Sequence, residues 1–69
     1  MKGLAFTSMR VGESYKLINY GETSEFRLVE VLNRYDYRLQ DIHTMELYNM
    51  SDLTKFGKGG DFELRELRH

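Results

Sequence analysis

Basic and aromatic side chains alternate most densely at residues 33–38, which read Asn-Arg-Tyr-Asp-Tyr-Arg. Tyrosine rings can stack on nucleic-acid bases or enclose a cation, and arginines can pair with phosphate or carboxylate groups. Arg34, Tyr35 and Arg38 are therefore the first candidates for a binding site, and Tyr20, in an earlier turn, is expected to join them. The alternative interpretation is structural, with Tyr35 packed over one end of the fold and the arginines only solvated.

A glycine-rich segment at residues 57–60 contains Lys58 and invites comparison with a phosphate-binding loop. Such a loop places a Ser or Thr directly after its lysine and lies between a parallel strand and a helix. Here Gly59 follows the lysine. The segment is therefore interpreted as a flexible loop that leads into the last strand.

Neither a metal centre nor a catalytic group is predicted. The chain has no Cys and only two His, His43 and His69, which are too few and too far apart for the ligand set of a metal site. Its eleven Asp and Glu are spread along the chain, and no nucleophile stands beside a base. We therefore expect no enzymatic activity and no cofactor.

Short apolar runs rich in Val, Ile, Tyr and Phe recur about every ten residues with turn residues between them, which is typical of strands. The expected strands are residues 14–19, 25–32, 37–41, 45–50 and 62–67. A helix is the alternative for the second and last of these runs, but runs this short fit strands better. One helical turn is expected at residues 51–57, capped by Ser51 or Asp52 and ended by Gly57 in a left-handed conformation.

The second run, residues 25–32, is apolar at both even and odd positions. Leu28 is even, whereas Val29 and Val31 are odd. A flat strand with one buried face would alternate cleanly. A bulge near Val29 and Glu30 would instead bend a long strand, so that it contributes to two halves of one core.

This layout, with residues 11–15 leading into the first strand and the turn at 51–57 before the last, resembles the SH3-like small barrel. That group includes the Tudor, Sm-like and KOW modules. The resemblance implies an all-β fold: a five-stranded barrel over residues 11–69 with a long bent second strand and a short helical turn. Residues 1–10 form an N-terminal extension outside it, for which an extra edge strand, a short helix and a frayed tail are the alternatives.

The resemblance also implies a binding module, because these barrels generally hold peptides, modified lysines, RNA or copies of themselves. The chain departs from the SH3 pattern in having no Trp and no acidic ALYDY-like segment, which argues against polyproline recognition. Against the Sm-like pattern, residues 33–36 only loosely match the nucleotide-binding loop. No single family within the group is indicated.

Charge and hydropathy restrict the classes of function and the compartment that we expect. The chain has 69 residues and a formal charge of −1, which argues against a protein that mainly neutralises nucleic-acid phosphate. No run approaches a membrane span and residues 1–9 do not read as a secretory leader, so the cytoplasm is the expected compartment.

Three functions follow from these observations. The leading hypothesis is a module that binds a protein segment through one rim, with Tyr20, Arg34, Tyr35 and Arg38 as its contacts. The first alternative is a binder of single-stranded nucleic acid that adds two lysines to this set, Lys55 and Lys58. The second is a structural unit that associates with another copy of itself, as a homodimer, through its exposed strand edges.

Overall fold

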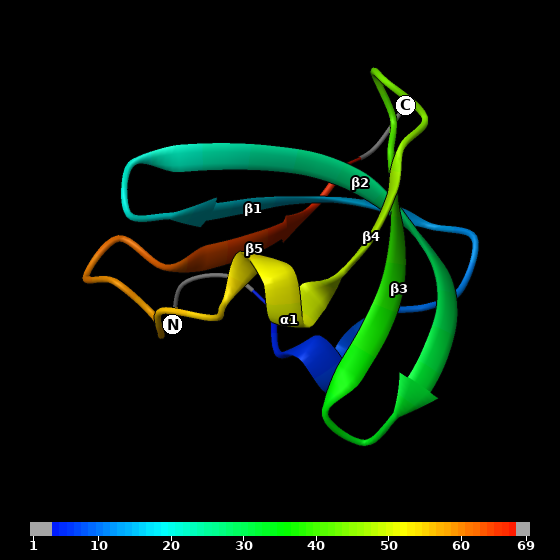
Figure 1. Ribbon diagram of the computed structural model, residues 1–69, viewed down its shortest axis with the longest axis horizontal. Coiled ribbons are helices and arrows are strands. Elements are labelled where there is room, and N and C mark those ends of the chain that lie inside the picture. The colour runs from blue at the N-terminus through cyan, green and yellow to red at the C-terminus, as the bar shows by residue number, and fades with distance from the viewer. Residues whose placement is uncertain (1–3, 68–69) are drawn as a thin grey trace.

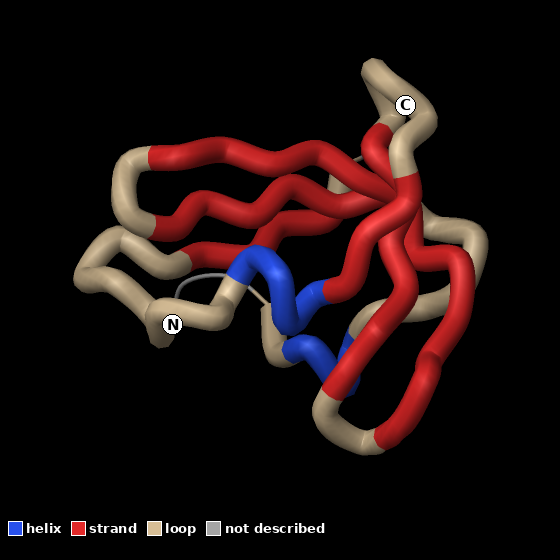
Figure 2. Tube along the Cα trace, in the orientation of Figure 1, coloured by secondary structure: helices blue, strands red, loops and turns tan. Residues whose placement is uncertain are grey.

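Five antiparallel strands form one sheet in the order β4-β3-β2-β1-β5. The computed structural model describes residues 4–67. In chain order the elements are η1 (Phe6–Ser8), β1 (Ser14–Asn19), β2 (Glu22–Asn33), β3 (Asp36–Asp41), β4 (Leu47–Asn49), α1 (Met50–Leu53) and β5 (Glu63–Glu66) (Figures 1 and 2). The expected β architecture, with five strands and one short helix before the last strand, is confirmed.

The sheet bends on β2, its longest strand. The first half of β2 pairs with β1, and its second half curves away beside β3 (Figure 1). The pairing with β3 shifts in register between Leu28 and Glu30, which leaves Val29 as the extra residue of a bulge. The bulge and the bend that were expected at this point are therefore confirmed.

The sheet is not closed into a barrel, which corrects the expected barrel architecture. β4 and β5 are its two outer strands. The fourth strand was expected to cover residues 45–50, but Met45 has a left-handed backbone, with a φ of 67°, and Met50 already begins α1. β4 is thereby reduced to the three residues Leu47–Asn49, which pair with β3 and not with β5.

The hydrophobic core fills the concave side of the bent sheet. Its buried members are Met9, Tyr15, Leu17, Phe26, Leu28, Tyr37, Leu39, Met50 and Leu64. Every second residue of β1 is buried, and in β3 Tyr37 and Leu39 are, as expected for strands with one face on a core. Loss of a fully buried aromatic side chain such as Phe26 would cost about 3–5 kcal/mol.

α1 begins one residue earlier than expected, and its cap differs from the prediction. Asn49, rather than Ser51 or Asp52, is the N-cap residue, and its side chain accepts from the backbone of Asp52. The Asp52 carboxylate accepts in turn from the Asn49 amide at 3.0 Å, which completes a capping box. The left-handed conformation predicted for Gly57 is confirmed by its φ of 89°, although the helix itself already ends at Leu53.

The segment before β1 packs onto the sheet. Phe6 lies in the 3-10 turn η1 and packs against the core, and Met9 is one of the core residues. The backbone amide of Leu4 donates to the carbonyl of Leu64 in β5 at 2.7 Å. Of the alternatives for the extension, the short helix is the one seen at Phe6–Ser8; residues 1–3 and His69 lie outside the described residues.

Candidate functional site

A groove of about 490 Å³ lies between η1 and the end of the β2–β3 hairpin. Mainly apolar side chains line it, from two segments that are distant in sequence, residues 6–9 and 31–37. These lining residues are Phe6, Thr7, Met9, Val31, Asn33, Arg34, Tyr35 and Tyr37. We call this the hairpin groove.

The bulge in β2 explains why an aliphatic side chain reaches this groove. Before the bulge the even residue Leu28 is buried, whereas beyond it the odd residue Val31 pairs with the buried Tyr37 of β3 and lies on its side of the sheet. Val31 is nevertheless 51% exposed, whereas its partner Tyr37 is buried in the core. The strand thus presents an apolar side chain that nothing in the described chain covers fully.

Phe6 forms the opposite wall. Its ring makes an edge-on contact with Tyr37, with ring centroids 6.1 Å apart, and a second one with Phe62, at 5.7 Å. Packing of this kind fixes the orientation of the rings. The groove is therefore a shaped feature between two packed elements.

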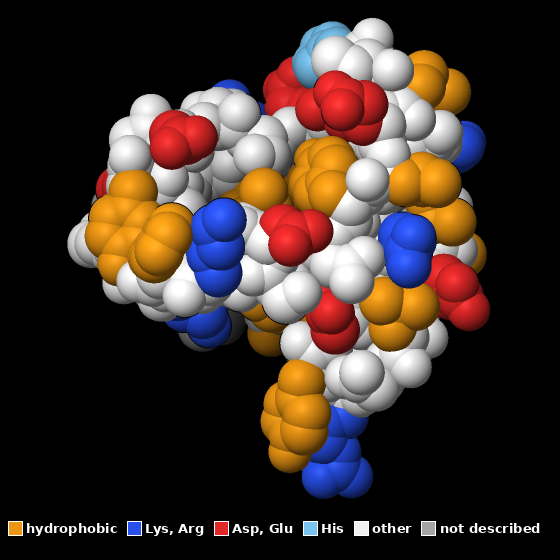
Figure 3. Space-filling model, in the orientation of Figure 1, with side chains coloured by type: hydrophobic (Ala, Val, Ile, Leu, Met, Phe, Trp, Pro, Cys, Tyr) orange, Lys and Arg blue, Asp and Glu red, His pale blue; other side chains and the backbone are white. Residues whose placement is uncertain are grey.

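Arg34 and Tyr35 form the tip of the hairpin at the rim of the groove. Tyr35 is 82% exposed, and the Arg34 guanidinium lies 6.0 Å from the centre of its ring. The Asn33 side chain accepts from the Tyr35 amide at 2.8 Å, which holds the turn. Figure 3 shows a hydrophobic and a basic side chain projecting together from the end of this hairpin.

A second hollow, of about 310 Å³, adjoins the hairpin groove. It shares Phe6, Thr7, Arg34, Tyr35 and Tyr37 with the groove and adds Lys58 and Phe62, among others. Lys58, from the loop before β5, places its ammonium 5.2 Å from the centre of the Phe6 ring and 4.8 Å from that of Phe62.

The structure does not place Arg38 at this site. Its neighbours along β3, Tyr37 and Leu39, are both buried, so Arg38 lies on the opposite face of the sheet. There its Nε atom is inaccessible and has no hydrogen-bond partner within the described residues. Arg34 and Tyr35 are thus brought together with the groove, and Arg38 is not.

Tyr20 lies at the other end of β2, in the β1–β2 turn (Figure 1). Its hydroxyl donates to the carbonyl of Phe56 at 2.9 Å and its amide to Asp61 at 2.8 Å, so it is held by the loop before β5. With Lys55 and Phe56 it lines a separate hollow of about 220 Å³. Lys55 therefore does not share a hollow with Lys58.

The loop at residues 57–60 is fastened to the end of β1. Asn19 is 7% exposed, and its amide group donates to the carbonyls of Leu53 and Gly57 and accepts from the amide of Gly59. The amides of Gly57 and Gly59, which a phosphate-binding loop would need free as donors, are taken by the Thr54 carbonyl and by Asn19. These bonds support the interpretation of this segment as a connection.

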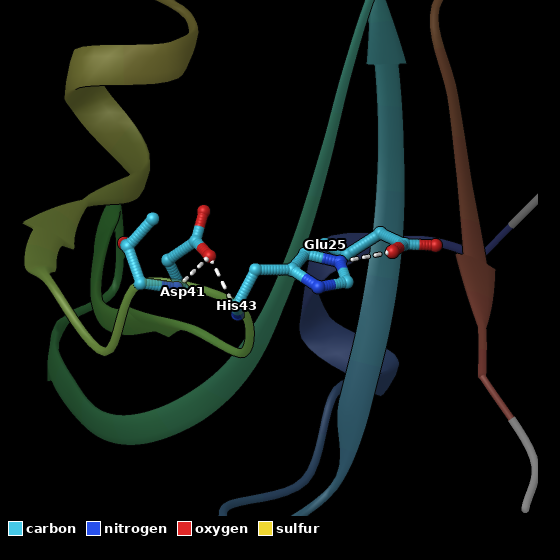
Figure 4. A network of polar contacts seen from close by, with 4 residues as sticks. Glu25, Asp41 and His43 are labelled. Atoms are coloured by element: carbon cyan, nitrogen blue, oxygen red, sulfur yellow. Dashed lines mark hydrogen bonds and ion pairs between the residues drawn. The ribbon is translucent and has the colours of Figure 1, made fainter.

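A polar network joins the β3–β4 turn to β2, away from the hairpin groove (Figure 4). His43 Nε2 lies 2.6 Å from a carboxylate oxygen of Glu25, and Asp41 accepts from the amides of His43 and Thr44. These two amide bonds, with that from Thr44 the larger cause, lower the pKa of Asp41. The network holds the turn in place. Within residues 4–67 no cluster of three or more His, Cys, Asp or Glu could bind a metal ion.

Comparisons with known proteins add no family assignment. No protein-family model matches the chain, and neither the curated proteins nor the solved structures compared with it give a match. No helix in the described part of the chain is long and apolar enough to cross a membrane. The site must therefore be understood from its own chemistry.

That chemistry is suited to holding an apolar group beside an anion. The walls offer aromatic and aliphatic surface through Phe6, Val31 and Tyr35, and the rim offers Arg34 and Lys58 as cations. Removal of such surface from water is favourable by about 25 cal/mol per Å², before the entropic cost of association is subtracted. The cations can add charge-assisted hydrogen bonds.

Sequence reasoning missed several lining residues, among them Phe6, Met9 and Phe62. Phe6 and Met9 belong to the segment assigned to an N-terminal extension, and Phe62 was assigned to a strand. Val31 could have been found, because a one-residue bulge at Val29 moves the core-facing side chains from even to odd positions.

Proposed function

We propose that this chain is a non-enzymatic interaction module that binds a protein segment in the hairpin groove. One observation carries the proposal: the apolar groove is bordered by Tyr35, which is 82% exposed in a turn that its neighbours hold in place. Large exposed aromatic side chains at a concave apolar surface are the usual anchors of protein–protein recognition. The contacts proposed here are Arg34 and Tyr35 from the predicted set, together with Phe6, Val31 and Tyr37.

A protein segment is favoured over single-stranded nucleic acid. The walls of the groove carry aliphatic side chains, which suit apolar side chains better than nucleotides. Among residues 4–67, Arg34 and Lys58 alone bring positive charge to the two adjoining hollows, and the whole chain has a formal charge of −1. A nucleic-acid groove needs a basic track along the backbone.

The relation to the SH3-like group also stays a proposal. The strand order β4-β3-β2-β1-β5, the bend in β2 and the position of α1 before β5 support it. The sheet is open between β4 and β5, so the proposal concerns the layout of the elements. The cytoplasmic location expected from the sequence stays a prediction.

The test is selection of short random peptides displayed on phage against the immobilised protein. We expect peptides to be retained by the wild type and lost by Tyr35→Ala and Val31→Asp. The matched control is Phe56→Ala, which removes an aromatic side chain of similar exposure, 80%, from the other end of the molecule. Circular dichroism melting of each variant checks that loss of binding is not loss of folding.

Two outcomes would overturn the proposal. One is that the wild type retains no peptide; binding of a single-stranded oligonucleotide with an affinity that falls steeply with salt would then indicate the nucleic-acid alternative. The other is that Phe56→Ala abolishes peptide binding while Tyr35→Ala does not. The second outcome would move the site to the hollow beside Tyr20.

A further inference from the structure

Each of the two cations beside the hairpin groove is positioned by aromatic rings before any partner arrives. Lys58 Nζ lies 4.8 Å from the centre of the Phe62 ring and 5.2 Å from that of Phe6. The guanidinium of Arg34 lies 6.0 Å from the centre of the Tyr35 ring. Contacts of this kind restrict long flexible side chains and leave their N–H donors available.

Neither cation has a carboxylate partner within residues 4–67. The ion pairs that these residues make with one another are His43–Glu25 and Arg65–Glu63, both elsewhere. No Asp or Glu of the described part of the chain lines the groove or the adjoining hollow.

The acidic residues closest in sequence to these two cations are committed to other bonds. Asp36 accepts from the amides of Tyr37 and Ser51, the Ser51 hydroxyl and the Asn49 side chain. Asp61 accepts from the two amides of the β1–β2 turn. Within residues 4–67 the positive charge beside the groove thus has no carboxylate partner, although the formal charge of the chain is −1.

We infer that the segment bound in the hairpin groove is acidic: an apolar side chain enters the groove, and Asp or Glu carboxylates beside it meet Lys58 and Arg34. The inference rests on the proposed function and adds the chemical class of the partner. Carboxylates of the partner accept charge-assisted hydrogen bonds from both cations. A basic segment would bring like charges together at the rim, which selects against it.

The experiment uses peptides obtained by the phage selection, synthesised in pairs in which every Asp and Glu is kept or replaced by Asn and Gln. Binding to the full chain is measured by fluorescence anisotropy at low and at physiological salt. We expect the acidic member to bind about tenfold more tightly, a difference of about 1.4 kcal/mol. Higher salt should narrow the difference, because exposed ion pairs are screened.

Charge variants of the protein give the reciprocal test. Lys58→Gln and Arg34→Gln should each reduce the advantage of the acidic peptide, and Lys58→Glu should shift the selected sequences toward Lys and Arg. Lys55→Gln is the matched control, because Lys55 also lies over an exposed phenylalanine ring, that of Phe56 at 5.3 Å, but borders a different hollow. It should leave the preference unchanged.

The outcomes separate this inference from the proposed function. If the retained peptides show no preference for Asp or Glu and both members of each pair bind equally, the inference of an acidic partner is wrong. The hairpin groove then remains the proposed binding site. Equal effects of Lys55→Gln and Lys58→Gln would also overturn it. Failure to retain any peptide would overturn the proposed function, and this inference with it.

Discussion

Asp61 and Tyr20 are 41 residues apart in the chain, yet Oδ1 of Asp61 accepts a hydrogen bond of 2.8 Å from the Tyr20 amide. Its second oxygen accepts from the amide of Gly21 at 2.7 Å. The bond from Gly21 is the largest cause that lowers the pKa of Asp61 below its ordinary value of 3.8; partial desolvation opposes it and the bond from Tyr20 adds to it. The carboxylate thereby ties the β1–β2 turn to the loop before β5.

The variant Asp61→Asn is expected to unfold at a lower temperature than the wild type at neutral pH. Asparagine offers one acceptor oxygen in place of two and carries no charge. Because the folded-state pKa is lowered, the stabilisation is present above the ordinary Asp value of 3.8 and is lost as the pH falls through the folded-state pKa. Thermal melts from neutral pH into this acid range should show the two proteins converging.

The control for Asp61 is Glu22→Gln, which neutralises an exposed carboxylate beside the same turn. It should change the melting temperature little. A difference between Asp61→Asn and the wild type that stays constant down to strong acid would contradict the assigned role of the carboxylate.

The variant Asn19→Ala is expected to lower the free energy of unfolding by about 2 kcal/mol or more. Asn19 is 7% exposed and bonds three backbone groups, one at the end of α1 and two in the loop before β5, which would lose their partner together. Urea unfolding measures the loss, with an unchanged slope as the sign of a comparable transition. Asn33→Ala removes one exposed bond, to the Tyr35 amide, and should cost clearly less; equal losses would speak against the loop anchor.

Gly59→Ala and Gly60→Ala form a matched pair. Neither glycine requires a left-handed backbone, so the two substitutions differ in what the added methyl group meets. At Gly59 it would lie 2.9 Å from a ring carbon of Tyr20, whereas at Gly60 nothing lies within 4 Å. We expect Gly59→Ala to lower the melting temperature and Gly60→Ala to leave it unchanged or raise it slightly. The reverse order would contradict the packing of Tyr20 on this loop.

Tyr48→Phe is expected to leave stability unchanged or to raise it. The Tyr48 hydroxyl is inaccessible and has no hydrogen-bond partner in the described chain, and burial, with a smaller contribution from the charge of Asp41, raises its pKa to about 12. Tyr15→Phe is the contrast, because the Tyr15 hydroxyl accepts from the Arg10 amide at 2.7 Å and its removal leaves that amide unpaired. Chemical denaturation should give Tyr15→Phe a lower free energy of unfolding than Tyr48→Phe. Equal free energies for the two variants would contradict these assignments.

Much of the sheet could be predicted, because apolar and polar residues alternate along its strands and glycines mark turns between them. The first strand was predicted with its exact bounds, 14–19, and the bulge at Val29 follows from the change of parity in β2. The start of β2 at Glu22 was missed, because Glu-Thr-Ser after Gly21 has the composition of a turn, whereas these residues pair with the end of β1. Local composition there is overruled by the partner strand.

The candidate site was less predictable, since it depends on contacts between distant segments. The exposure of Tyr35 follows from its place in a turn, but the groove beside it needs Phe6, whose segment has no repeating pattern. Tyr20 looked like a surface aromatic, and its bonds to Phe56 and Asp61 are visible only in three dimensions. The side of the sheet on which Arg38 lies follows from the alternation along β3.

The Leu4 amide bonds the Leu64 carbonyl on the side of β5 that faces away from β1. An open sheet normally offers its outer strands as templates on which further chains can add, the first step toward fibrous aggregates. Here the contact from Leu4 occupies part of one edge, and the other edge is only the three residues Leu47–Asn49, which turn at once into a helix. An open sheet can thereby limit the addition of strands from other chains at its edges without closing into a barrel.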